Sequence, residues 1–381
     1  MQNLNSKLES VSDFFKNGDS ALGYRRLIDC GLDTRNIDVY KKTLALIEKS
    51  ENENQTNDFS EVFDFIHSLN DINMPASQAS SLPLLKVENI GKQYAKSQFK
   101  ISPLSFQLNY GEIIGLVGEN GNGKTTLLKL LTQDLEADEG SLSFNLKHDS
   151  VFELRSQLVY IPQRVPKWHG SLLDNLQFAM AQNGILGNDN MVWVDMVIAR
   201  LGLRKFKHLN WNQISSGYRT RFEIAKSLLR KPKLMLLDEP LSNLDIISQQ
   251  TILQDLKFLA QSESNPFGLI LSSQQLYEVE KIADLVIFLN QGEAQFQNNN
   301  AERNEADDLI FEIETTENRE TLLKVFETLD IKALNFNGGV FIAHFHYSTK
   351  GADVFKNIGN YDLKLNAIRN ISQSSRRFFI K

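Results

Sequence analysis

The sequence predicts a mixed α/β core with a parallel sheet, flanked by an N-terminal bundle of helices and a small C-terminal α+β domain. Three observations support this prediction. A glycine-rich loop follows a short apolar run near the middle of the chain, helical periodicity fills the first 70 residues, and strand and helix patterns alternate after residue 309. A length of 381 residues leaves room for two or three domains.

The glycine-rich loop reads GENGNGKTT at residues 118–126 and fits the pattern G-x-x-x-x-G-K-[ST]. It lies between the apolar run 112–117 and the helical pattern 126–132, which is the strand–loop–helix context of a P-loop. Small residues let backbone N–H groups surround a phosphate at a helix N-terminus. We expect Lys124 to bridge the β- and γ-phosphates of a nucleotide and the Thr125 hydroxyl to bind Mg²⁺. The expected nucleotide contacts from this loop are Gly118, Asn120, Gly121, Asn122, Gly123, Lys124, Thr125 and Thr126.

A second apolar run, residues 234–237, predicts a buried parallel strand that ends at Asp238 and Glu239. The carboxyl end of such a strand lies at the edge of the sheet where phosphates bind. Asp238 is therefore expected to hold the Mg²⁺ shell, and Glu239 to polarise the attacking water. An acidic pair after a strand can also be no more than a turn, but the phosphate loop in the same chain favours the catalytic interpretation.

The segment ISSGYRTR at residues 214–221 ends 17 residues before Asp238 and resembles the signature sequence of the ATP-binding cassette (ABC) ATPases. The resemblance implies an ABC-type P-loop NTPase core. It also implies that Ser215 and Gly217 cap the γ-phosphate of a nucleotide bound by another subunit. Ser216 and Tyr218 stand where the family usually has glycine and glutamine.

Further segments match the family in its own order, over about residues 84–295. The resemblance implies that Gln163 touches Mg²⁺ and couples the site to a transmembrane partner, that Asp245 lies in a segment crossing a dimer interface, and that Tyr94 stacks on adenine. Tyr94 could instead be a packing aromatic at the sheet edge. Gln274 stands where the family commonly has a histidine next to the γ-phosphate. An amide can donate and accept but carries no charge, so this position weakens the case for hydrolysis and not the case for binding.

The resemblance implies a two-fold homodimer that encloses two ATP molecules and drives a separate transmembrane permease subunit, as in exporter-type ABC transporters. The permease is expected to enter a groove near Gln163, Trp168 and Leu172, although Leu172 could equally belong to the core of the helical subdomain. The other function left open is a nucleotide-gated interaction protein with slow or no turnover, in which the N-terminal helices recruit an unknown partner.

Composition excludes some partners. The formal net charge is −6, the isoelectric point is about 5.7 and there is no run of lysine or arginine, which disfavours nucleic acid. The N-terminus does not resemble a secretory leader and no apolar run is long enough to span a bilayer, so we expect a cytoplasmic protein, peripheral on the membrane. The lone Cys30 cannot form an internal disulfide.

The predicted domains are a helical bundle at residues 1–72, a linker at 73–83, an ABC ATPase domain at 84–297 with a helical subdomain at about 164–214, and an accessory domain at 309–381. The accessory domain shows a βαββαβ order, which suggests a ferredoxin-like fold. His344 and His346 share one face of a strand there, without the further ligands that a metal site needs.

Overall fold

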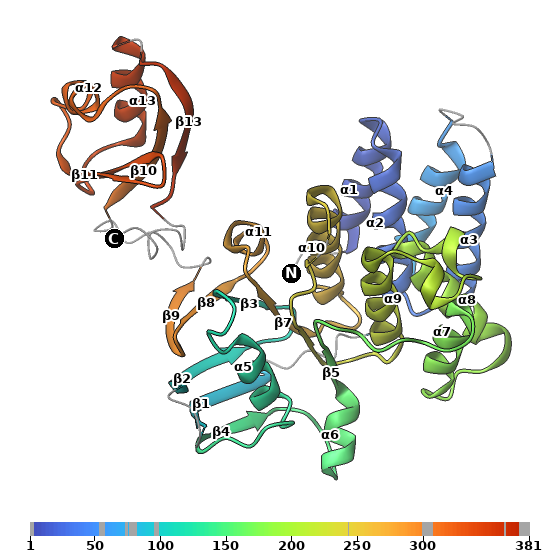
Figure 1. The fold of residues 1–381 in the computed structure, drawn as a ribbon. Coiled ribbons are helices and arrows are strands. Elements are labelled where there is room, and N and C mark those ends of the chain that lie inside the picture. Colours follow the sequence, from blue (N-terminus) through green and yellow to red (C-terminus); the bar gives the residue numbers. More distant parts are fainter. Residues whose placement is uncertain are drawn as a thin grey trace. The chain divides into compact units, whose positions relative to one another are not determined.

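The computed structural model describes residues 4–52, 58–72, 75, 82–94, 99–242, 244–298, 308–361 and 363–372. Most of the predicted linker at 73–83 lies outside these residues. The chain divides into two compact units, one formed by Met1–Ala283 with Leu289–Ala294 and the other by Asp284–Phe288 with Gln295–Lys381. Figure 1 shows the elements of both units.

The central sheet has six strands in the order β5-β6-β7-β3-β8-β9. Its parallel strands are short apolar runs that are buried almost throughout, as expected of a sheet covered on both faces. This confirms the predicted α/β core with a parallel sheet. The strands are β3 (Ile113–Val117), β5 (Leu158–Ile161), β6 (Leu234–Leu237), β7 (Gly268–Ser273), β8 (Leu285–Asn290) and β9 (Glu293–Asn298).

A second, antiparallel sheet has the order β2-β1-β4 and comprises β1 (Leu85–Gln93), β2 (Lys100–Leu108) and β4 (Glu139–Phe144). In β2, buried and exposed residues alternate along much of the strand, because one face packs on the core and the other faces water. Helix α5 (Lys124–Leu131) follows the phosphate loop directly. The other helices among the strands are α6 (Val151–Gln157), α10 (Ile246–Ala260) and α11 (Leu276–Glu280).

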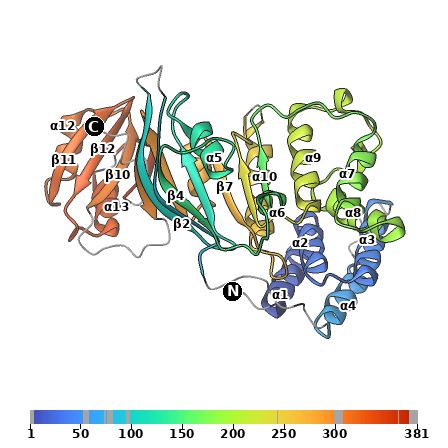
Figure 2. The ribbon, with the colours of Figure 1, turned by 90° about the horizontal axis from the view of Figure 1, so that it is seen from below.

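The segment between β5 and β6 is helical, and Figure 2 shows α7, α8 and α9 as a group beside α10. Each of α7 and α9 begins at a serine, Ser171 or Ser215, whose hydroxyl accepts a hydrogen bond from a first-turn backbone N–H. The helices are α7 (Leu172–Ala181), α8 (Gly187–Arg200) and α9 (Ser216–Leu229), and two 3₁₀ turns, η1 (Arg204–Phe206) and η2 (Trp211–Gln213), lie between α8 and α9.

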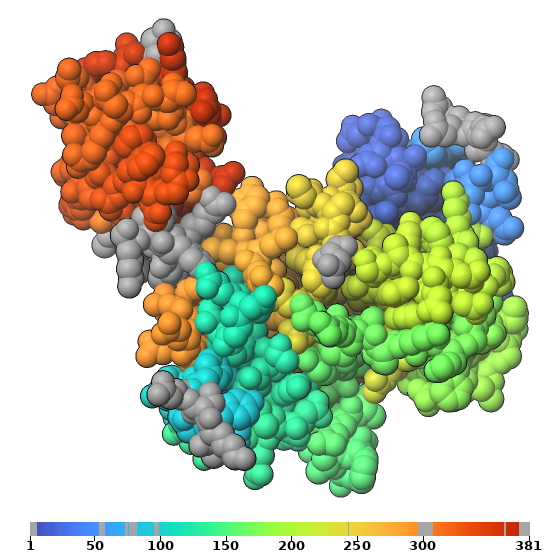
Figure 3. Space-filling model, in the orientation of Figure 1, coloured from blue at the N-terminus to red at the C-terminus, as the bar shows by residue number. Residues whose placement is uncertain are grey.

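The first four helices are α1 (Leu4–Lys16), α2 (Ser20–Asp33), α3 (Ile37–Asn52) and α4 (Ser60–Leu69). Their apolar faces enclose a core that includes Leu8, Phe15 and Leu69. A second apolar cluster joins α2 and α3 to α8, since Ile28, Tyr40 and Ile47 pack on Met196. Residues 84–297 are called the cassette below. In Figure 3 the blue N-terminal helices lie directly against the yellow and green atoms of the cassette.

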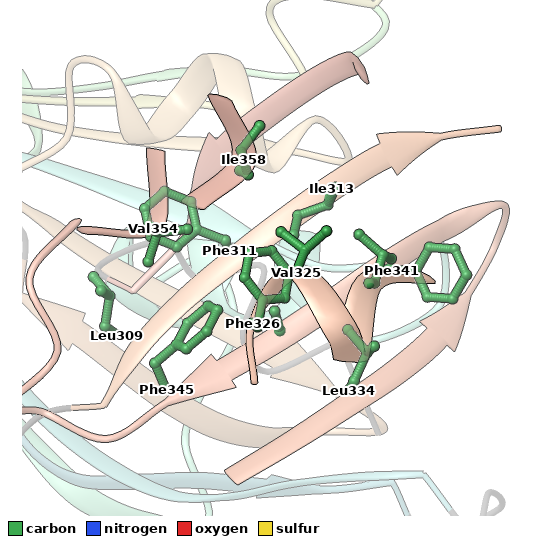
Figure 4. Close-up of a cluster of buried hydrophobic side chains, with 12 residues drawn as sticks. Leu309, Phe311, Ile313, Val325, Phe326, Leu334, Phe341, Phe345, Val354 and Ile358 are labelled. Atoms are coloured by element: carbon green, nitrogen blue, oxygen red, sulfur yellow. The ribbon is translucent and has the colours of Figure 1, made fainter. Parts of the chain in front are cut away.

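The C-terminal elements run in the order β10 (Leu309–Thr315), α12 (Arg319–Val325), β11 (Ile331–Asn337), β12 (Val340–Phe345), α13 (Gly351–Asn360) and β13 (Leu365–Asn370). They form an antiparallel sheet in the order β11-β12-β10-β13. Figure 4 shows the core of this domain, where Phe311 and Phe345 from the sheet meet Phe326 and Val354 at the two helices. This βαββαβ arrangement is that of a ferredoxin-like fold.

Candidate functional site

The glycine-rich loop lies between β3 and α5 and depends on residues without a side chain. Gly121 and Gly123 have φ of 86° and 100°, which is the left-handed region that glycine adopts without strain. A Cβ on Gly118 would lie 2.3 Å from the carbonyl oxygen of Leu289, and one on Gly123 would lie 2.8 Å from the ring of Phe99. The loop backbone is therefore packed closely, and the N-terminus of α5 carries no side-chain cap that would occupy its N–H groups.

Lys124 turns its ammonium group back into this loop. The side chain is only 5% exposed, and Nζ donates hydrogen bonds to the carbonyl oxygens of Gly118 (2.7 Å) and Glu119 (3.2 Å). Nζ also lies 3.0 Å from Oε1 of Glu239. The Lys124 ammonium group is thus buried within the loop, in a position to bind a phosphate group.

Asp238 follows β6 and collects three hydroxyl groups. Thr125 Oγ1 donates to Oδ2 of Asp238 (2.7 Å), the Tyr160 hydroxyl donates to the same oxygen (3.2 Å), and Ser272 Oγ donates to Oδ1 (2.7 Å). The sequence reasoning missed Tyr160 and Ser272. Tyr160 lies on β5 and Ser272 on β7, the two strands that pair in parallel with β6. Knowledge of the strand order would therefore have pointed to both residues. Burial and the neighbouring Asp238 carboxylate raise the pKa of Tyr160, so its hydroxyl stays protonated and can donate.

Glu239 has a φ of 51°, which is uncommon for a residue with a side chain. Its backbone N–H donates to Ser272 Oγ (2.8 Å). Its buried carboxylate faces Lys124, and Oε1 makes no hydrogen bond to any described residue besides this ion pair. Lys124, Thr125, Asp238 and Glu239 are therefore in one connected group at the carboxyl edge of the parallel sheet.

Gln163 lies two residues after β5, and Gln274 directly follows β7. Both residues are exposed at the same edge of the sheet as Asp238. Tyr94 follows the end of β1 and is 38% exposed, so its ring is open to a flat ligand. Asn122, in the loop itself, accepts a hydrogen bond through its side-chain oxygen from the backbone N–H of Gln291 (3.1 Å), which ties the loop to the turn after β8.

The signature segment begins α9. Ser215 is exposed and caps the helix by accepting from the N–H of Tyr218 (3.4 Å). Tyr218 packs on Phe206 with ring centroids 4.0 Å apart, so this residue serves packing within the subdomain. Gly217 lies against Leu244, because a Cβ there would be 2.7 Å from the Leu244 side chain.

Asp245 is the N-cap of α10. Its carboxylate accepts from the backbone N–H of Ser248 (2.9 Å) and from the Ser248 hydroxyl (2.6 Å), and these hydrogen bonds lower its pKa. The next two residues, Ile246 and Ile247, are exposed although they are large and apolar. Within the described part of the chain, Ser215 and Asp245 bond to their own helices rather than to the phosphate loop.

Trp168 and Leu172, expected near the permease groove, are both buried, and Leu172 belongs to the core of the helical subdomain, the alternative left open for it. Trp168 stacks on Trp211, donates from Nε1 to the carboxylate of Glu223, and has Lys226 above its ring. Leu172 is the first residue of α7 and is fully enclosed. Apolar residues that follow Gln163 thus form the core of the helical subdomain, and the exposed surface next to Gln163 consists of Arg164, Lys167 and His169.

Comparison with known proteins agrees with this geometry. A family model described as ABC transporter matches residues 101–242. The chain is 31% identical over 214 residues to an uncharacterized ABC transporter ATP-binding protein of Bacillus subtilis, YdbJ, and the alignment covers 55% of this chain and 68% of that protein. The chain belongs to the ABC transporter ATP-binding proteins.

Other ABC relatives differ in what their names say they transport. The lantibiotic transport ATP-binding protein SrtF of Streptococcus pyogenes is 30% identical over 211 residues, which is 55% of this chain and 88% of that protein. The phosphonates import ATP-binding protein PhnC of Treponema denticola is 28% identical over 228 residues, or 56% and 88%. The solved structure of cbiO1 from Clostridium perfringens, part of the ABC transporter complex cbiONQ, shares the fold with a TM-score of 0.51 at 24% identity, over 57% of this chain and 89% of that one.

Among the described residues, no helix combines the length and the apolar character needed to cross a bilayer. No group of three or more histidine, cysteine, aspartate or glutamate side chains in the same residues is arranged to hold a metal ion.

Proposed function

We propose that this chain binds and hydrolyses ATP at the group formed by Lys124, Thr125, Asp238 and Glu239. One observation carries the proposal: the Lys124 ammonium sits within a glycine-rich phosphate loop, 3.0 Å from a buried carboxylate that follows a parallel strand. Phosphate oxygens would replace the carbonyl groups that Lys124 now contacts. The backbone of Gly118, Asn120, Gly121, Asn122, Gly123 and Thr126 would surround the phosphates, and Tyr94 would stack on adenine.

The residues fit Mg²⁺. Thr125 Oγ1 and Asp238 Oδ2 lie 2.7 Å apart, and hydroxyl and carboxylate oxygens are ligands that this hard cation prefers. Gln163 would add an amide oxygen from the end of β5. Bound with the nucleotide, the ion would neutralise part of the charge on the phosphates.

Glu239 is the proposed general base. Its carboxylate is buried next to the charge that would meet the γ-phosphate, so it can accept a proton from a water molecule held there. Gln274 would donate its amide N–H to the γ-phosphate or to that water. Since it cannot carry a charge, it should hold the water less firmly than an imidazole would, and turnover should be slow.

We infer a homodimer with two ATP molecules at the interface. The exposure of Ser215 and the surface position of Asp245 with Ile246 and Ile247 support this inference. Exposed isoleucines next to a capped helix start are suited to burial against a second copy. Ser215 and Gly217 of one copy would then meet the γ-phosphate bound at Lys124 of the other.

We propose a role beside a separate transmembrane permease subunit, with this chain on the cytoplasmic face of the membrane. The relatives' names, which describe ATP-binding proteins of transporters, support a role in transport. Because one relative is named for import and another for lantibiotic transport, the direction of transport stays open. The permease would contact the exposed surface next to Gln163, formed by Arg164, Lys167 and His169, and not the buried Trp168 and Leu172. We propose the domain limits given above for the N-terminal helices (1–72), the ATPase (84–297) and the accessory domain (309–381).

A second candidate function is a nucleotide-gated interaction protein, and Gln274 is the observation that favours it. In that case ATP would close the dimer, turnover would be very slow, and the N-terminal helices would present a surface to an unknown partner. Purification in mild detergent separates the two candidates, since a transporter subunit should bring a membrane protein with it.

The ATP-binding proposal is tested by removing the charge in the phosphate loop. We expect Lys124→Ala to weaken ATP binding by about 100-fold or more, because charge-assisted hydrogen bonds to phosphate are among the strongest that proteins make. Lys129→Ala is the matched control, since Lys129 is exposed on the same helix, and it should leave the dissociation constant within about two-fold. Binding is measured by calorimetry at the same pH and salt, and equal affinities for Lys124→Ala and wild type would rule the assignment out.

A further inference from the structure

A cavity of about 540 Å³ lies between the N-terminal helices and the cassette. Its apolar wall includes Val11 and Phe14 of α1, Trp193 and Val197 of α8, and Phe258 of α10. The volume falls in the range of small-molecule sites, roughly 300–1,000 Å³. Apolar walls with a few polar groups are typical of such sites.

The cavity lies away from the nucleotide site. Lys233 and Phe267 line it, and these residues directly precede β6 and β7. Asp238 and Gln274 directly follow the same two strands at their carboxyl ends. The two sites are therefore at opposite ends of the parallel strands, and a ligand in the cavity would not contact a nucleotide at Lys124.

The wall carries an excess of positive charge. Six cationic residues line it against only two acidic ones, Asp29 and Asp33. Two acids outside the wall also pair with these cations: Asp255 with Arg200 (2.6 Å) and Glu263 with Lys7 (3.2 Å). The six cationic residues therefore exceed the four nearby acids, Asp29, Asp33, Asp255 and Glu263, by two charges. The cationic residues are Lys7, Arg26, Arg35, Arg200, Lys231 and Lys233.

Two of the guanidinium groups have unused donors. Arg200 Nη2 and Arg26 Nε are buried and have no hydrogen-bond partner among the described residues. Arg200 is only 1% exposed and Arg26 7%. A buried donor left unpaired is unfavourable, and more so when it is charged. An acceptor that enters the cavity would remove this cost.

Lys231 and Lys233, in the segment between α9 and β6, also line the cavity and add positive charge. Burial and the positive charge of Arg35 lower the pKa of Lys231 and of Lys233. Lys231 lies over the ring of Trp193, 4.5 Å from its centroid. A negative group would offset the repulsion between these cations, while Trp193 offers an apolar surface beside it.

We propose that this cavity is a binding site for a small amphipathic anion. A carboxylate or phosphate group would accept from Arg26 Nε and Arg200 Nη2, and an apolar body would lie against Trp193 and Phe258. Arg200 joins Asp29 of α2 to Asp255 of α10, so the ligand would strengthen the contact between the N-terminal helices and the cassette.

Binding of decanoate to the full chain, measured by calorimetry, tests the proposal. Wild type is expected to bind decanoate at least 10-fold more tightly than decanol, its neutral counterpart. Arg26→Met should weaken decanoate binding at least about 10-fold, since it removes a charge-assisted hydrogen bond to the carboxylate. Arg25→Met is the matched control, because Arg25 lies on the same helix but does not line the cavity, and it should change affinity by less than about two-fold.

A second pair guards against misfolding of the Arg26 variant. Lys231→Met should also weaken decanoate binding. Arg230→Met should not, because the neighbouring Arg230 does not line the cavity. Decyl phosphate in place of decanoate shows which head group is preferred. The proposal is overturned if decanoate does not bind wild type at millimolar concentration, if decanol binds equally well, if both members of each pair behave alike, or if saturating ATP displaces decanoate competitively.

Discussion

Glu239 is held in the left-handed backbone region, which costs an L-residue about 1–2 kcal/mol. Two contacts offset this cost, the hydrogen bond from its N–H to Ser272 and the ion pair of its carboxylate with Lys124. The conformation directs the side chain of the residue after Asp238 toward the phosphate loop. Two consecutive carboxylates can therefore serve one site, Asp238 among the hydroxyl groups and Glu239 beside the ammonium group.

We expect Glu239→Gln to bind ATP normally and to turn it over about 10²–10⁴-fold more slowly, which is the usual contribution of a general base. The amide keeps the size of the side chain and loses the proton acceptor. Phosphate release at saturating Mg-ATP measures the rate, and the variant should accumulate as an ATP-bound dimer in size-exclusion chromatography. Glu119→Gln, an exposed carboxylate in the same loop, is the control and should keep the wild-type rate within a few-fold. A Glu239→Gln variant as active as wild type would assign the base elsewhere.

Gln274 offers a graded test of turnover. Gln274→His should leave ATP affinity within a few-fold and raise the hydrolysis rate, and Gln274→Ala should lower it, because the side chain holds the attacking water. Gln275→His, at the exposed neighbouring position, should change neither. If wild type is fast and the histidine variant is slower, glutamine is itself the adapted catalytic group and the slow-turnover function is wrong.

At the scale of elements, α9 and α10 both begin with a polar cap at the surface, Ser215 and Asp245. Each cap accepts a hydrogen bond from one first-turn backbone N–H of its helix. Apolar or small residues follow the caps, Ile246 and Ile247 on one helix and Gly217 on the other. Two helix starts with this composition offer small and apolar surface for contact with a second copy of the chain.

We expect Ser215→Arg to block ATP-driven dimerisation while leaving the affinity of the monomer for ATP unchanged, because the bulky cation would occupy the space of the opposite nucleotide. Ser156→Arg, which adds the same side chain to an exposed position on α6, should dimerise as wild type does. Analytical ultracentrifugation with and without Mg-ATP gives the answer. Reduced ATP binding by the Ser215→Arg monomer would instead place Ser215 in its own subunit's site.

Sequence patterns predicted what is local and missed what depends on how elements meet. The loop 118–126 and the strand before Asp238 could be predicted because each is a short continuous motif. Tyr160 and Ser272 are 78 and 34 residues from Asp238, and only the order of β5, β6 and β7 brings them together. Trp168 is unremarkable in sequence, and its burial depends on Trp211 and Glu223, which belong to other elements.

At the scale of the whole molecule, Arg200 joins the N-terminal helices to the cassette. It is fully enclosed and pairs with Asp29 of α2 and Asp255 of α10, and these two carboxylates raise its pKa although burial acts to lower it. Asp33 and Arg35 add contacts to the segment after α10, through Ser262 and Ser264. The helical periodicity of residues 1–72 could predict the helices. It could not predict which surface of the cassette they pack against, because the contacting residues, such as Arg200 and Ser262, lie more than 150 residues away in the sequence.

We expect Arg200→Met to destabilise the protein by about 3–5 kcal/mol, since it removes the buried cation that pairs with both Asp29 and Asp255. Urea unfolding measures the loss. Lys49→Met is the control, because Lys49 makes an ion pair with Glu61 at the surface and should contribute about 1 kcal/mol or less. Adding Asp29→Asn and Asp255→Asn to Arg200→Met should recover much of the loss, and no recovery would show that packing, not charge, is what Arg200 provides.

Cys30 gives this chain a built-in reporter. It is the single cysteine of the sequence, it is buried between the N-terminal helices and the cassette, and burial together with the charges of Asp29 and Asp33 raises its pKa. A protonated, buried thiol reacts slowly with an alkylating reagent, which reaches it through the cavity or when the surrounding helices separate. The rate at which unmodified protein is alkylated under native conditions therefore measures how accessible this cavity and its surrounding helices are. Comparing that rate with and without ATP shows whether events at the phosphate loop reach the opposite end of the sheet, with no engineered label.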